Sequence, residues 1–155
     1  MTSNSSVFEL HCRAERKALC WVREVVVQTA GALGFSGDDL NKIELSVDEA
    51  CANVMDHAYP EPPDIELPLV VRFETSEDHL TITVMDRGVG GPAGEKHQGV
   101  EDIGEYLKVR RFRGLGTYIM QQFMDKVEFQ QSPDSGTSVS MIKYREASGS
   151  NIGEG

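Results

Sequence analysis

Two glycines, Gly114 and Gly116, stand just before a stretch of helical periodicity and are the residues best suited to hold an anion. The first N–H groups of a helix lack intrahelical acceptors, and the helix dipole places partial positive charge there. Glycines leave these groups exposed, so the segment from Arg113 to Thr117 could cradle a phosphate. The segment lacks the Gly-Lys-Ser/Thr ending of a P-loop and the Gly-x-Gly-x-x-Gly of a dinucleotide fingerprint. A Gly-x-Gly pair alone is therefore a weak indication.

A second candidate is Asp86, followed by Gly88 and Gly90, at the end of a run rich in β-branched residues. A carboxylate at the end of a strand can accept a hydrogen bond from an amino group such as that of adenine. Glycines just after it allow the backbone to approach a flat ring closely or to take a positive φ. The same residues also suit a tight turn with Asp as the turn former, so both interpretations stay open.

The third candidate is the pair Glu49 and Asn53, which lie four residues apart in a stretch of helical periodicity. Residues at this spacing stack on one face of a helix, and this face lies away from the apolar stripe. Polar side chains are expected on any solvated helix face, so the pair by itself does not indicate a site. Asp48 adds a second carboxylate, which points about 100° around the helix from Glu49.

Apolar periodicity predicts the elements that must position these residues. Helical spacing predicts three helices, over residues 15–33, 38–58 and 115–125. Alternating runs and runs rich in β-branched residues predict five strands, over residues 7–12, 67–75, 79–85, 126–131 and 137–144.

The order of these elements predicts the fold class. Sequential hairpins imply antiparallel pairing, so we expect an α+β two-layer sandwich whose mixed, mainly antiparallel sheet is covered on one face by three helices. Residues 86–114 are rich in glycine and charge, so we expect a long loop there with one short helix near 100–109. The expected organisation is one domain over residues 1–145 and a disordered tail over 146–155.

The composition narrows the classes of function. The 155-residue chain carries a formal net charge of −10. Duplex nucleic acid is bound mainly by Lys and Arg that neutralise phosphates, so direct nucleic-acid binding is not expected. The three cysteines include no Cys-x-x-Cys pair, and no stretch approaches the ~20 apolar residues of a membrane span. No membrane partner is therefore expected, and the expected location is a reducing cytoplasm.

The order and spacing of the three candidates say more than any one of them. A helical Glu-x-x-x-Asn, an Asp-x-Gly-x-Gly ending a strand, a loop and a Gly-x-Gly opening a helix resemble the GHKL ATPases, which include gyrase, histidine kinases and MutL. Within that group the chain is most similar to the anti-sigma-factor serine kinases of the RsbW type, over about residues 7–144. The matching segments are Leu45–Tyr59, Gly114–Met120, Phe123–Phe129 and Gly136–Ser138.

This resemblance implies the ATP-binding Bergerat fold with a mobile lid over residues 91–113. It implies that Asn53 binds a Mg²⁺ ion bridging the ATP phosphates, and that Asp86 contacts the adenine amino group. It also implies that Glu49 is the general base that takes the proton from a serine hydroxyl of a protein substrate. The other residues implied to bind the nucleotide are Gly88, Gly90, Arg113, Gly114, Leu115, Gly116, Thr117 and Thr137.

The resemblance further implies that the chain sequesters a sigma factor, phosphorylates a STAS-domain anti-sigma-factor antagonist and acts as a homodimer. Two alternatives stay open: a switch kinase of a stress-signalling complex, and an ATP-dependent binding module without significant kinase activity. The roles of three arginines are also open. Arg23 lies where such kinases touch their sigma factor but could simply be solvated, Arg111 could supply a lid cation, and Arg87 has no explanation.

Overall fold

The computed structural model describes residues 4–57, 68–86, 114–132 and 136–146 of the chain. In these ranges the elements follow the order β1, α1, α2, β2, β3, α4, β4, β5. The helices are α1 (Ala18–Ala32), α2 (Gly37–His57) and α4 (Gly114–Phe123). The strands are β1 (Ser6–Arg13), β2 (Pro68–Thr75), β3 (His79–Asp86), β4 (Lys126–Ser132) and β5 (Gly136–Tyr144).

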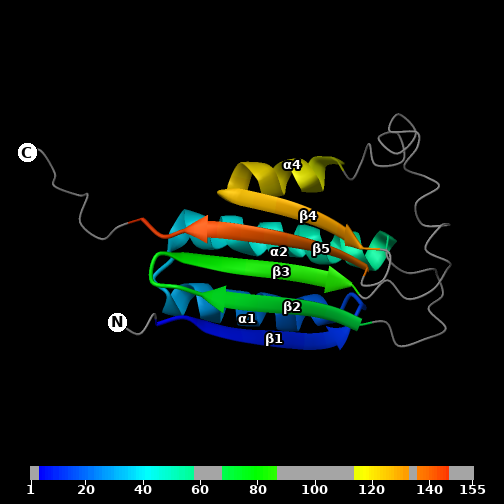
Figure 1. Cartoon of the computed structure of the whole chain (residues 1–155), viewed down its shortest axis with the longest axis horizontal. Coiled ribbons are helices and arrows are strands. Elements are labelled where there is room, and N and C mark those ends of the chain that lie inside the picture. The colour runs from blue at the N-terminus through cyan, green and yellow to red at the C-terminus, as the bar shows by residue number, and fades with distance from the viewer. Residues whose placement is uncertain (1–3, 58–67, 87–113, 133–135, 147–155) are drawn as a thin grey trace, which may run out of the picture.

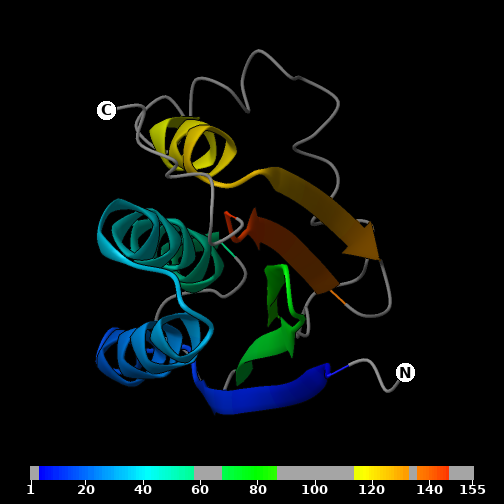
Figure 2. The ribbon, with the colours of Figure 1, turned by 90° about the vertical axis from the view of Figure 1, so that its left-hand side faces the viewer.

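The strands form one sheet in the order β1-β2-β3-β5-β4, and each neighbouring pair is antiparallel. The three helices lie on one face of this sheet, with α2 between α1 and α4 (Figures 1 and 2). The expected α+β two-layer sandwich is confirmed. The described sheet is antiparallel throughout rather than mixed, because β5 turns back from β4 and inserts beside β3.

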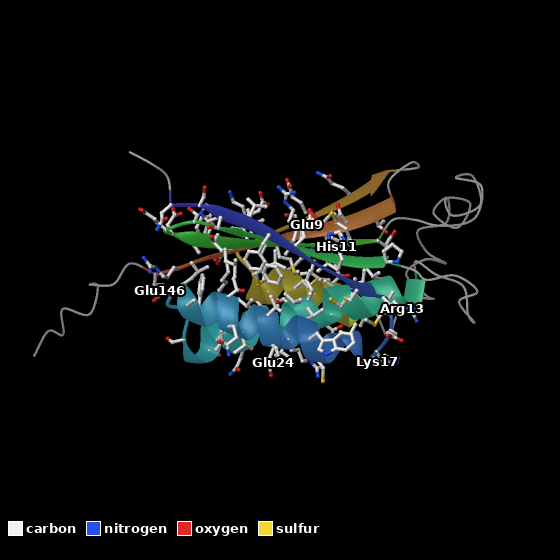
Figure 3. The ribbon with its side chains drawn as sticks, turned by 90° about the horizontal axis from the view of Figure 1, so that it is seen from below. Glu9, His11, Arg13, Lys17, Glu24 and Glu146 are labelled. Atoms are coloured by element: carbon white, nitrogen blue, oxygen red, sulfur yellow. The ribbon has the colours of Figure 1, made fainter. Side chains whose placement is uncertain are left out.

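The core lies between the sheet and the helices, and Figure 3 shows the two layers edge-on with side chains packed between them. Alternate residues of β3 point into this core, as the period of a strand requires. The apolar stripe expected along α2 is confirmed in its buried members, which are Ile43, Val47, Ala50, Cys51 and Val54. On the opposite side of α1, Glu24 points away from the sheet (Figure 3). No helix in the described part of the chain is long and apolar enough to cross a membrane.

Two of the expected helix boundaries were wrong by more than one residue. The first helix begins at Ala18 rather than 15, because the backbone turns there: Glu15 N–H donates to the Arg13 carbonyl, and Ala18 N–H donates to the Glu15 carbonyl. The last helix ends at Phe123 rather than 125. Asp125 N–H donates to the Ile142 carbonyl, so the backbone there already pairs with the sheet. The other described ends agree with expectation to within one residue.

Three expectations lie outside the described residues. They are the short helix near 100–109, the lid over residues 91–113, and the tail over 146–155 except for its first residue. The division into a domain over 1–145 and a tail therefore stays a prediction.

At the end of α1, Gly34 has the positive φ of +92° that suits a glycine stop signal.

Lys143 fastens the C-terminal end of α4 to the sheet. Its side chain is only 10% exposed on the core side of β5. The ammonium group donates a 2.8 Å hydrogen bond to the carbonyl of Phe123, the last residue of α4. The carboxylates of Asp39 and Asp125 each lie 3.8 Å from it. Because the last carbonyls of a helix lack intrahelical donors and attract positive charge, this lysine caps the C-terminal end of α4.

Replacing the ammonium group of Lys143 should therefore loosen α4. We expect Lys143→Met to lower the free energy of unfolding by about 1–3 kcal/mol, because a part-buried carbonyl loses its charged donor. Urea denaturation measures this change. The matched control is Lys42→Met, which removes an exposed ion pair with Asp38 within one helix and should change stability little. Equal losses in the two variants would contradict the anchoring role of Lys143.

Candidate functional site

Four element ends that are distant in sequence lie at one end of the molecule (Figure 1). They are the C-terminal ends of α2 and β3 and the N-terminal ends of α4 and β5, on the right of that view. Each of these ends carries one of the residue groups that the sequence singled out. The antiparallel sheet produces this arrangement, because β3 and β5 run in opposite directions and the end of one lies beside the start of the other.

Asp86 and Thr137 form the sheet part of this end. Asp86 is the last residue of β3, and its side chain is 2% exposed. The Thr137 N–H donates to Asp86 Oδ1 at 3.2 Å, and the Thr137 hydroxyl donates to Asp86 Oδ2. These two hydrogen bonds hold the buried carboxylate at a fixed place. The register that pairs Met85 with Ser138 brings the two residues together.

Glu49 and Gly116 form the helix part. Glu49 is half-buried on α2, and Gly116 is buried in the first turn of α4. A Cβ atom placed on Gly116 would lie 2.5 Å from Glu49 Oε2. The Glu49 carboxylate therefore lies directly against the backbone of α4 near its N-terminal end. A negative charge is stabilised at that end of a helix.

The neighbouring carboxylate, Asp48, points toward α1 and is already engaged. Arg23 on α1 donates from its Nε to both Asp48 oxygens at 2.9 Å. These hydrogen bonds raise the pKa of Arg23 above its ordinary value. Successive residues of a helix point about 100° apart, so α2 turns Asp48 toward one neighbouring helix and Glu49 toward the other. Glu49 is thus the carboxylate that the structure turns toward α4.

Asn53 lies one helical turn beyond Glu49 on α2 and is half-buried. Between them Cys51 faces the core, and burial raises the pKa of its thiol well above the usual range. The thiol is therefore neutral and acts as an apolar packing group. The side chains of this part of α2 that are available for chemistry are therefore those of Glu49 and Asn53, which lie away from the core.

The remaining predicted nucleotide-binding residues divide into two groups. Gly114 and Leu115 open α4, and Thr117 is half-buried one residue after Gly116. Another group lies outside the described residues: Gly88, Gly90 and Arg113, together with Arg87 and Arg111.

Sequence reasoning missed two contacts at this site. The pairing of Arg23 with Asp48 joins positions 25 residues apart, and no periodic signal links them. The contact between Glu49 and Gly116 joins two helices whose packing is not encoded in either one alone. Both contacts depend on which helices become neighbours in the layer.

The chemical properties of this end fit a nucleotide. The buried Asp86 carboxylate is an acceptor suited to an amino group. The N-terminus of α4 lies at the same end of the molecule, and helix N-termini favour anions. Among the described residues, no group of three or more His, Cys, Asp or Glu side chains could hold a metal ion by itself. A Mg²⁺ ion carried by nucleotide phosphates needs only one or two protein ligands, so an asparagine amide is compatible with it.

Comparison with known proteins identifies the family. The protein-family model for the histidine kinase-like ATPase domain matches residues 12–143 of this chain. Among curated relatives, serine-protein kinase RsbW of Bacillus velezensis is 32% identical, and the alignment covers 93% of this chain and 89% of the relative. RsbW of Bacillus subtilis is 31% identical with the same coverage. RsbW of Halalkalibacterium halodurans is 35% identical over 79% of this chain and 74% of the relative.

A solved structure supports the same fold. The RsbU and RsbW domains of Rv1364c from Mycobacterium tuberculosis align with a TM-score of 0.60 and 16% identity, over 90% of this chain. The chain spans about a third of that longer protein, at 34% of its length. At this identity the likeness shows the fold alone. The family match and the curated relatives show that the chain belongs to the RsbW family of serine-protein kinases, within the histidine kinase-like ATPases.

Proposed function

We propose that this chain is an ATP-dependent serine-protein kinase that also sequesters a sigma factor, and that its protein substrate is a STAS-domain antagonist of the sequestration. Membership of the RsbW family supports the kinase activity and the use of ATP. The observation that supports the proposed chemistry most directly is the contact of the Glu49 carboxylate with the first turn of α4. It brings the proposed proton acceptor to the helix end proposed to hold phosphate.

In this proposal the nucleotide lies at the end of the molecule where β3 ends and α4 begins. The buried Asp86 carboxylate accepts a hydrogen bond from the adenine amino group, and Thr137 holds that carboxylate in place. The N-terminal turn of α4, from Gly114 to Thr117, faces the phosphates with its free N–H groups. Gly88, Gly90 and Arg113 complete the pocket in the family pattern.

Asn53 is the proposed protein ligand of Mg²⁺. When bound, this ion would neutralise the negative charge of the phosphates. The chain has a net charge of −10, so its overall charge does not favour binding of phosphate. The position of Asn53 on α2, one turn from Glu49, puts the proposed metal ligand and the proposed base on the same helix face.

Glu49 is the proposed general base. The substrate serine oxygen attacks the γ-phosphorus of ATP, the bond between the γ-phosphorus and the β–γ bridging oxygen breaks, and ADP leaves. Glu49 accepts the proton that the serine hydroxyl gives up. Its neighbour Asp48 is a poorer candidate, because both of its oxygens accept hydrogen bonds from Arg23.

The proposed cellular role follows the family. We propose that the protein works in the cytoplasm as a homodimer. The face of the sheet opposite the helices carries no covering layer in the described part of one copy (Figure 2). The net negative charge favours proteins with basic surfaces as partners over nucleic acid.

Glu49→Gln tests the proposed base while keeping the size of the side chain. We expect the rate of phosphoryl transfer to serine to fall by about 10²-fold or more, because proton removal is lost. The affinity for ATP should stay close to that of the wild type. Transfer of radiolabelled phosphate to a STAS-domain protein measures the rate, and Asp48→Asn is the matched control that should retain activity. A fully active Glu49→Gln variant would remove Glu49 from the mechanism.

Asn53→Ala tests the proposed metal ligand. The dissociation constant for ATP in Mg²⁺ should rise by about tenfold or more, which corresponds to about 1.4 kcal/mol of lost binding free energy. The difference from the wild type should disappear in EDTA. Isothermal titration calorimetry measures both conditions, and the exposed Asn41 on the same helix supplies the control Asn41→Ala. Unchanged affinity in Mg²⁺ would show that the site has been assigned wrongly.

The partners are tested with the tagged protein in extracts of its native cells, with and without ATP. We expect a sigma factor to be retained in an ATP-dependent manner, and a STAS-domain protein to be phosphorylated on serine by the purified chain. Mass spectrometry identifies both proteins and the modified residue. Phosphorylation of a STAS protein without any retained sigma factor would favour the switch-kinase alternative. Retention of partners without phosphorylation would favour the binding module.

A further inference from the structure

Glu49 is the residue nearest to the side-chain side of Gly116. The three atoms nearest to a Cβ placed there are all from Glu49: Oε2 at 2.5 Å, Cδ at 3.4 Å and Cβ at 3.7 Å. Real Cβ atoms do not approach another atom as closely as the first of these distances. The Glu49 side chain therefore occupies the space that any larger residue at position 116 would need.

The backbone conformation does not explain a glycine at this position. Among the described glycines, positive φ angles occur at Gly34, Gly37 and Gly136, and Gly116 lies instead within the regular helix α4. Glycine disfavours a helix relative to alanine, because it loses more backbone entropy on folding. The notable property of position 116 is therefore steric: an added Cβ atom there would meet the carboxylate of the proposed base.

We infer that Gly116 is a positioning residue for Glu49, in that its missing side chain is what lets the carboxylate lie on the first turn of α4. This inference rests on the proposed role of Glu49 as general base. It differs from the role implied for Gly116 by the family resemblance, in which the glycine shapes the nucleotide pocket. The two roles have different kinetic consequences.

The contact also has an electrostatic part. The first turn of α4 contains no acidic residue of its own, so Glu49 supplies a carboxylate there from the neighbouring helix. The N-terminus of a helix carries partial positive charge, so it is a suitable place for a carboxylate. A base held in one place is closer to a productive geometry than one that moves freely, and displacements of about 1 Å can lower a rate by about 10²-fold.

Gly116→Ala is expected to move the carboxylate and leave the fold intact. The obstructing Oε2 atom is at the end of a flexible side chain, so it can rotate away while the helix backbone stays where it is. Alanine also favours the helix. The variant should therefore fold, bind nucleotide and transfer phosphate slowly.

The first experiment separates the two roles by kinetics. For Gly116→Ala we expect kcat for transfer to the STAS-domain substrate to fall by about tenfold or more, with the dissociation constant for ATP within about threefold of the wild type. A rise of about tenfold or more in that constant with unchanged kcat would overturn the inference, because it would assign Gly116 to the phosphates. The matched control is Gly31→Ala in α1, where an added Cβ meets nothing within 4 Å.

The second experiment needs no protein substrate. A double-mutant cycle compares the change in Tm caused by Gly116→Ala in the wild type and in a Glu49→Ala background. With Glu49 present, we expect no gain in Tm. Without it, the added methyl group has free space, and Tm should rise by about as much as Gly31→Ala raises it. Equal changes in both backgrounds would overturn the inference.

The outcomes also distinguish this inference from the proposed function. If Glu49→Gln transfers phosphate at the wild-type rate, Glu49 is not the base and the proposed mechanism fails. A non-additive cycle would still show in that case that Gly116 positions Glu49. Conversely, an inactive Glu49→Gln variant with an additive cycle would leave the mechanism standing and would reject the positioning role.

Discussion

The place of α2 in the middle of the helix layer is the constraint on which the site depends. Its apolar stripe packs on the sheet, one flank contacts α1 through Asp48, and the other contacts α4 through Glu49. A helix has 3.6 residues per turn, so the position of a residue in the sequence decides which neighbour its side chain faces. The apolar residues of α2 must therefore face the sheet, Asp48 must face α1 and Glu49 must face α4. Rotation of α2 about its axis would disturb the core and both carboxylates together.

The neighbouring elements limit that rotation. The helix α4 is held at its C-terminal end by Lys143 and contacts Glu49 near its N-terminal end. The sheet contributes the buried pair of Asp86 and Thr137, whose position follows from the antiparallel register of β3 and β5. A proton acceptor, a helix N-terminus and a buried carboxylate thus come from separate elements that one packed core holds together. This arrangement suits phosphoryl transfer, in which catalysis rests mainly on positioning and electrostatics.

Much of the fold was predictable, because it rests on local patterns. Local patterns identified the described helices and strands. The hairpin of β2 and β3 followed from two runs rich in β-branched residues joined by Ser-Glu-Asp. The start of α1 and the end of α4 were misjudged by two or three residues. There the backbone hydrogen bonds are made with a turn in one case and with β5 in the other, and apolar spacing carries no information about such bonds.

The sequence by itself determined the element types, the two-layer class, the family and the residues to suspect, because these depend on short-range periodicity and motif spacing. Only the tertiary structure decided that β5 inserts beside β3, that Arg23 donates hydrogen bonds to Asp48, and that Glu49 lies against Gly116. The physical reason is that each of these contacts joins segments distant along the chain. Which segments become neighbours is decided by how the whole apolar surface is buried, and local propensity does not encode that choice.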